Sequence, residues 1–141
     1  MPRVMISYRN IGSQLDFARS LEVELTNAGL ETWFDKKNIP RLSKWEDEIF
    51  NGIIGSDYVV LCLSPEYFKS ETCLFESYIA RGYGKRILPI IVPYEHEGNE
   101  HEGNKSVIER IRDCEETRGI DHLNIISFHS GEVVGLREDS A

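Results

Sequence analysis

Short apolar runs alternate along the chain with longer stretches in which apolar residues recur every three or four positions. The short runs are typical of buried strands and span residues 4–6, 30–34, 58–63, 87–92 and 123–128. The longer stretches predict amphipathic helices that begin near Ser13, Ser43, Ser70 and Ser106. Strands and helices that alternate with short connections favour a parallel sheet. We therefore predict an α/β domain of the flavodoxin-like, doubly wound kind, with a five-stranded parallel sheet and helices on both faces.

Two segments carry no apolar pattern. Residues 95–104 are the five-residue sequence EHEGN repeated in tandem, and we predict a solvated loop there rather than a metal site built on its histidines. Residues 131–141 follow the last predicted strand and are interpreted as a tail or linker leading toward a further segment. The predicted domain therefore spans residues 1–130.

Composition argues against several classes of protein. The formal net charge of −8 disfavours nucleic-acid binding, because such domains normally present a basic face. No apolar run approaches the ~20 residues of a membrane span, and the first residues lack a signal-peptide layout. The three cysteines are far apart and form no CxxC pair, which indicates reduced thiols. We expect a cytoplasmic protein that binds neither membrane nor nucleic acid and holds no metal.

The charge is unevenly distributed. Residues 36–44 contain four basic residues and no acid, whereas residues 95–102 contain four glutamates. A basic run of this kind is usually a solvated loop. In an otherwise acidic chain, a role in binding an anion or an acidic protein surface is an equally good interpretation.

Ligands of doubly wound sheets bind beyond the carboxyl ends of the strands, so polar residues near those ends are the candidates for a functional site. No dinucleotide fingerprint, phosphate loop or nucleophile elbow is present. The unusual residue is Glu76, which shares a helix face with Cys73, Ala80 and Tyr83 at spacings of −3, +4 and +7. A carboxylate on such a face is costly unless it is paired or functional. Two interpretations stay open, a satisfied structural glutamate and a functional one.

Trp45 also has two interpretations. It begins the apolar stripe of its predicted helix, with Ile49 and Ile53, which favours packing in the core. The alternative is that the preceding loop exposes the indole ring so that it stacks on a ligand.

The order of these motifs resembles the Toll/interleukin-1 receptor (TIR) domain family, in its bacterial-type branch. Residues 4–9 (VMISYR) resemble the family's first box, and residues 34–49 resemble its second-strand loop. Residues 58–76, which end in Cys73-x-x-Glu76, resemble the stretch that carries the catalytic Cys-x-x-Glu. The match covers residues 4–93 in the family's order and spacing.

The resemblance implies an NAD⁺ glycohydrolase or cyclase. Such an enzyme takes NAD⁺ as substrate, needs no cofactor, and releases nicotinamide together with ADP-ribose or a cyclic isomer. By position, Glu76 matches the catalytic glutamate. The positions that match substrate-binding residues are Ser7, Tyr8, Arg9, Asp35, Lys44, Trp45 and Cys73. The positions that match the assembly loop are Lys36, Lys37, Arg41 and Leu42.

The resemblance also implies partners and a biological role. TIR domains often assemble with other TIR domains, so a homo-oligomer or filament is expected, with a role in immune or anti-phage defence signalling. Two departures from the family pattern stand out: Thr72 replaces a frequent Trp, and Arg41 follows Pro40 in place of a frequent Gly. The rival interpretation is a non-catalytic scaffold that acts through TIR–TIR contacts. Glu76 favours the enzyme, whereas Thr72 favours the scaffold.

Overall fold

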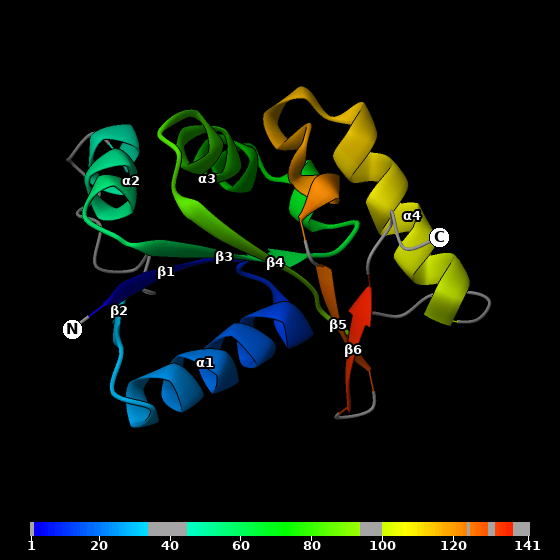
Figure 1. Cartoon of the computed structure of the whole chain (residues 1–141), viewed down its shortest axis with the longest axis horizontal. Coiled ribbons are helices and arrows are strands. Elements are labelled where there is room, and N and C mark those ends of the chain that lie inside the picture. The colour runs from blue at the N-terminus through cyan, green and yellow to red at the C-terminus, as the bar shows by residue number, and fades with distance from the viewer. Residues whose placement is uncertain (1, 34–44, 94–99, 124, 130–131, 137–141) are drawn as a thin grey trace.

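One mostly parallel sheet organises the chain (Figure 1). The computed structural model describes residues 2–33, 45–93, 100–123, 125–129 and 132–136. The described strands are β1 (Arg3–Ser7), β2 (Glu31–Trp33), β3 (Tyr58–Leu63), β4 (Arg86–Ile91), β5 (Ile125–His129) and β6 (Glu132–Leu136). The described α-helices are α1 (Gly12–Asn27), α2 (Trp45–Ile54), α3 (Glu71–Gly82) and α4 (Glu100–Asp113).

The strand order is β2-β1-β3-β4-β5-β6, and every pair among β1 to β5 is parallel. This is the flavodoxin-like order, so the predicted fold class is confirmed. Strand β6 adds a sixth, antiparallel strand that pairs with β5. It lies in the segment that the sequence pattern assigns to a tail, and that assignment is therefore wrong for residues 132–136.

Helices cover both faces of the sheet. Helix α1 lies on one face, and α2, α3 and α4 lie on the other (Figure 1). Side chains of successive strand residues point to opposite faces. In β1, Val4 and Ile6 accordingly pack on the α1 side, whereas Met5 packs on the side of the other three helices. The odd-numbered positions of β1 therefore point toward helix α3.

Three local predictions differ from the structure. Helix α4 begins at Glu100, so the second EHEGN copy is helical rather than a loop, and Asn104 within it is 9% exposed. Helix α1 is predicted to begin near Ser13, but it begins at Gly12, and its N-cap residue Ile11 forms no side-chain cap bond. In β4, which the pattern predicts to be fully buried, Leu88 is 38% exposed. It pairs with Val60 on the α1 face, where a single described helix covers the sheet.

Candidate functional site

Helix α3 carries Glu76 to the carboxyl-terminal edge of the sheet. The helix begins at a capping serine, because the Ser70 hydroxyl accepts a hydrogen bond from the Cys73 amide at 3.2 Å. The inner face of the helix is buried and comprises Cys73, Glu76, Ser77 and Ala80. Glu76 is fully buried, with 0% of its surface exposed. The helical spacing therefore predicts correctly that Glu76 lies on the packed side of its helix.

A serine at the end of β1 holds the carboxylate. The Ser7 hydroxyl donates a hydrogen bond to Glu76 Oε1 at 2.9 Å, and Ser7 is itself fully buried. This contact joins residues 69 positions apart in the sequence. Buried hydrogen bonds to a charged group are stronger than neutral ones, so the pair fixes α3 against the end of β1.

Tyr67 extends this contact into a chain of hydroxyl groups. Its phenol oxygen lies 2.7 Å from Ser7 Oγ and 2.7 Å from Ser77 Oγ. The phenol and the Ser77 hydroxyl each also lie 3.1 Å from the Cys73 carbonyl oxygen. We refer to Ser77, Tyr67 and Ser7 as the hydroxyl chain. It is buried throughout and ends at the Glu76 carboxylate.

The surroundings of Tyr67 keep its phenol neutral. Burial, and then the nearby Cys73 thiol and Glu76 carboxylate, raise the pKa of Tyr67 well above its ordinary value of 10.0. The hydrogen-bond contacts with Ser7 and Ser77 lower the pKa of Tyr67, but not enough to reverse this shift. At neutral pH the phenol is therefore a hydrogen-bond donor with one proton.

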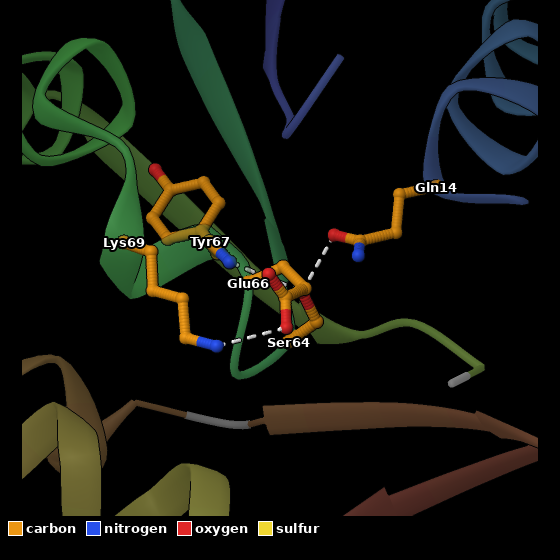
Figure 2. Close-up of polar contacts among 5 residues, drawn as sticks. All are labelled: Gln14, Ser64, Glu66, Tyr67 and Lys69. Atoms are coloured by element: carbon orange, nitrogen blue, oxygen red, sulfur yellow. Dashed lines mark hydrogen bonds and ion pairs between the residues drawn. The ribbon is translucent and has the colours of Figure 1, made fainter. Parts of the chain in front are cut away.

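A second polar contact ties Tyr67 to both layers of the fold. Figure 2 shows Gln14 of α1 pointing toward Ser64, which follows β3. The Ser64 hydroxyl donates to Gln14 Oε1 at 2.6 Å and accepts from the Tyr67 amide at 3.2 Å. An exposed ion pair between Lys69 and Glu66, at 3.2 Å, spans the short 3-10 helix Tyr67–Lys69. The buried bonds to Ser64, rather than this surface pair, hold Tyr67 in place.

The family of the chain follows from comparison with known domains. A family model described as "TIR domain" matches residues 4–132. That span exceeds half of the chain. The chain belongs to the TIR domain family.

Solved structures agree with this assignment at low sequence identity. The TIR domains of the activated Roq1 resistosome, which directly recognises the pathogen effector XopQ, are 20% identical with a TM-score of 0.59. That match covers 80% of this chain and 63% of the other, so this TIR domain spans less than two thirds of the Roq1 chain. The TIR domain of the Toll-related receptor TRR-2 from Hydra magnipapillata is 21% identical with a TM-score of 0.54, over 70% of this chain and 75% of that one.

A glycosidase shares the same fold. The CMP N-glycosidase BcmB from Clostridium botulinum is 14% identical with a TM-score of 0.51, and the match covers 92% of this chain and 90% of that one. No curated protein matches the sequence significantly. At these identities the solved structures show a common fold and nothing finer.

Two first-box residues of this TIR domain, Ser7 and Tyr8, point to opposite faces of the sheet. Ser7 contacts Glu76 through its hydroxyl group. The Tyr8 side chain is 1% exposed and packs on the α1 face with Ile6 and Val60, so it lies on the opposite side of the sheet from the carboxylate. Its backbone carbonyl nevertheless accepts a hydrogen bond from Cys73 Sγ at 3.3 Å. The structure thus brings Ser7 and Cys73 to Glu76, but not the Tyr8 ring.

The remaining predicted site residues of the TIR domain are less fully described. Arg9 follows β1 and is half-buried, and its Nε atom is buried without a hydrogen-bond partner among the described residues. Trp45 begins α2, but its side chain is not among those described. The other predicted residues lie outside the described part of the chain: Asp35, Lys36, Lys37, Arg41, Leu42 and Lys44.

Two residues of this site are not predicted by the sequence pattern. Tyr67 and Ser77 carry no periodic signal that separates them from ordinary core and helix positions. The available clue is position: Ser77 follows Glu76 directly, and Tyr67 lies between a buried strand and the helix that carries the glutamate. Conversely, the helical spacing predicts Tyr83 on the face of Glu76, yet Tyr83 is 57% exposed and its ring lies against Phe50 at 5.2 Å.

Other kinds of site find no support among the described residues. Within them, no three His, Cys, Asp or Glu side chains gather as a metal site would require. All three cysteines are free thiols, and Cys62 and Cys73 are buried. No helix in the described ranges combines the length and the hydropathy needed to cross a membrane.

Proposed function

We propose that this TIR domain cleaves NAD⁺ at the bond between nicotinamide and ribose. The observation that carries the proposal is a fully buried glutamate at the carboxyl edge of the sheet, bonded to Ser7 at 2.9 Å. In doubly wound folds this edge is where ligands bind. The other buried carboxylate of the described residues, Asp121, is accounted for by an ion pair with Arg112 at 3.2 Å, on a different part of the fold.

The proposed chemistry requires one carboxylate. When the glycosidic bond breaks, its electron pair passes to the ring nitrogen, and nicotinamide leaves as a neutral molecule that needs no general acid. The ribosyl group left behind is cationic, and the Glu76 carboxylate would stabilise it electrostatically. Water then attacks and releases a proton to give ADP-ribose, or an atom of the same molecule attacks to give a cyclic isomer. Ordinary glycosidases, in contrast, use a pair of carboxylates.

Two further facts support cleavage of an N-glycosidic bond. The match to a TIR family model places the chain in a family that includes NAD⁺-cleaving enzymes. The same fold occurs in BcmB, a protein described as a CMP N-glycosidase. Neither fact identifies a substrate, so the proposal depends on Glu76.

The burial of Glu76 bears on how the activity is controlled. A carboxylate with 0% of its surface exposed is out of reach of a ribose, so substrate binding requires the site to open. We propose that self-assembly of TIR domains opens it, through head-to-tail contact between the basic segment 36–44 and the acidic segment 95–102. The Roq1 TIR domains, which share this fold, belong to an assembled resistosome. The domain would then act in defence signalling in the cytoplasm.

The second candidate is a TIR scaffold without activity, and the same burial favours it. A glutamate fully enclosed by protein and bonded to Ser7 would serve structure alone. Thr72, half-buried beside Cys73 in α3, also removes the aromatic ring that often precedes this cysteine in the family.

Incubation of the protein with NAD⁺ over a wide range of protein concentration separates the two candidates. Nicotinamide release is measured by chromatography, and assembly is followed by light scattering in the same samples. Specific activity that rises as scattering rises supports the proposed enzyme and its activation. Assembly without nicotinamide release at any concentration supports the scaffold. If a monomer releases nicotinamide with a specific activity that does not change with protein concentration, the protein is an enzyme but is not activated by assembly.

A further inference from the structure

The direction of hydrogen-bond donation along the hydroxyl chain can be assigned by counting the protons that its groups carry. Each hydroxyl group carries one proton, and an ionised carboxylate can only accept. With Glu76 ionised, as the proposed chemistry requires, Ser7 donates its proton to Glu76 Oε1 at 2.9 Å, and the phenol is then the donor in the 2.7 Å contact between Tyr67 and Ser7. The phenol proton is then engaged with Ser7, and in the 2.7 Å contact between Tyr67 and Ser77 the serine is assigned as the donor.

The geometry favours this assignment over its alternatives. The Cys73 carbonyl oxygen is a second acceptor for Tyr67 and for Ser77, but it lies 3.1 Å from each, compared with 2.7 Å for the contacts within the chain. Shorter O–H···O contacts are the stronger ones. All three hydroxyl groups therefore point their protons toward Glu76. Hydrogen bonds aligned in one direction polarise each other, and they do so most strongly where water is excluded.

The phenol can keep this role over a wide range of pH. Its raised pKa means that Tyr67 holds its proton at any pH at which the domain would act. Tyr67 is held both at its backbone and at the tip of its side chain. The backbone amide donates to Ser64 Oγ at 3.2 Å, and the phenol contacts Ser7 and Ser77. Tyr67 and Ser7 are both fully buried, so water cannot take over the contact of either hydroxyl.

We propose that Tyr67 is a positioning residue for the reaction at Glu76: its phenol fixes the Ser7 hydroxyl as a donor, and Ser7 in turn keeps the carboxylate ionised and oriented. This inference rests on the proposed NAD⁺ cleavage. Tyr67 would therefore affect turnover indirectly, by positioning Ser7, without touching the substrate.

Tyr67→Phe tests the role because it removes the phenol oxygen and keeps the ring. We expect kcat for NAD⁺ cleavage to fall about tenfold, the rate equivalent of one lost hydrogen bond, with KM nearly unchanged. The acid limb of the pH–rate profile should move to higher pH, because the carboxylate then protonates more readily. The double variant with Ser7→Ala should be no slower than Ser7→Ala alone, since Tyr67 acts through Ser7.

Ser56→Ala is the matched control. The Ser56 hydroxyl is also buried and donates at 2.7 Å to the Gly52 carbonyl, but it lies after α2 and outside the hydroxyl chain. It should lose stability without a change in kcat or in the pH–rate profile. If Tyr67→Phe behaves as Ser56→Ala does, or if the Tyr67 and Ser7 effects simply add, the positioning role is wrong.

A readout without turnover keeps this test separate from that of the proposed function. The infrared carboxylate band of Glu76, isolated by subtracting the spectrum of Glu76→Gln, can be titrated with acid in the native protein and in Tyr67→Phe. A band that vanishes at higher pH in Tyr67→Phe supports control of Glu76 by the hydroxyl chain, and coincident titrations overturn it. If the assembled native protein releases no nicotinamide, the proposed function is wrong, and so is the role of Tyr67 in turnover. The infrared result would still show whether the hydroxyl chain controls the ionisation of Glu76.

Discussion

Raising the pH above 10 should destabilise the native domain more steeply than its Tyr67→Phe variant. Burial, then Cys73 and Glu76, hold the pKa of Tyr67 well above 10.0, the value that applies in the unfolded chain. Between these two pKa values the unfolded tyrosine has lost its proton while the folded one retains it. The free energy of unfolding therefore falls as the pH rises through this window, and below it the contribution of Tyr67 does not vary with pH.

The magnitude follows from one proton. A difference of one bound proton changes the free energy of unfolding by about 1.4 kcal/mol for each pH unit. Relative to its value at pH 8, the stability difference between the native protein and Tyr67→Phe should shrink by about 1.4 kcal/mol at pH 11. The other tyrosines and lysines are common to both proteins, so their titration cancels in the difference.

The assay is urea unfolding monitored by tryptophan fluorescence, repeated in steps from pH 8 to pH 11 for both proteins. The native protein should begin as the more stable of the two, because its phenol forms buried hydrogen bonds with Ser7 and Ser77. Parallel stability curves over the whole range would refute the reasoning, since they would mean that Tyr67 titrates alike in both states.

Three further predictions concern the N-cap of α3, Trp45 and the basic segment 36–44. Ser70→Ala removes the N-cap of α3 and should cost about 1 kcal/mol, seen as a melting temperature lower by about 3–5 °C; an unchanged melting temperature would contradict the cap. Trp45→Ala should lower turnover with little loss of stability if the indole stacks on substrate, whereas a calorimetric loss of about 3–5 kcal/mol would place it in the core. Reversal of Lys36, Lys37 and Arg41 to Glu should suppress light scattering and NAD⁺ turnover together. Added salt should likewise weaken assembly of the native protein. If neither the charge reversal nor added salt changes assembly and turnover, the charge-pairing model is wrong.

The position of Glu76 can be predicted because it depends on helix geometry alone. Residues at −3 and +4 on a helix share a face, and Cys73 and Ala80 are indeed fully buried beside the glutamate. The same reasoning fails at +7, because α3 ends at Gly82 and Tyr83 is its C-cap residue. Periodicity predicts a shared face only as far as the helix continues.

The hydroxyl chain cannot be predicted in this way because it depends on tertiary contacts. Ser7 and Tyr67 are 60 positions apart, and the residues around either one do not indicate the other as its partner. The burial of Tyr8, in contrast, is visible in the sequence. Val4 and Ile6 lie on one face of β1, and Tyr8, which follows its last residue, continues the alternation, so all three pack toward α1. The family resemblance assigns Tyr8 to the substrate, but the alternation is the better guide to where its ring lies.

The start of α4 and strand β6 could not be predicted for a different reason, because neighbouring segments decide their conformation. The second EHEGN copy forms the first turn of α4, although its five residues include no apolar side chain and by themselves predict a loop. Its conformation is decided by the amphipathic residues from Ser106 onward, which continue the helix and pack it on the sheet. Residues 132–136 likewise form a strand because β5 offers an edge for pairing, and Val133 and Val134 are too short a β-branched run to predict it by themselves.

The catalytic role of Glu76 is tested most directly by comparing NAD⁺ cleavage in the native protein and in Glu76→Gln under assembling conditions. Glutamine keeps the size of the side chain and can still accept the hydrogen bond from Ser7, but it removes the charge that would stabilise the ribosyl cation. We predict nicotinamide release at least about a hundredfold slower from Glu76→Gln, with an unchanged circular dichroism spectrum and no loss of melting temperature. A folded Glu76→Gln protein that cleaves NAD⁺ at the native rate would contradict the assignment.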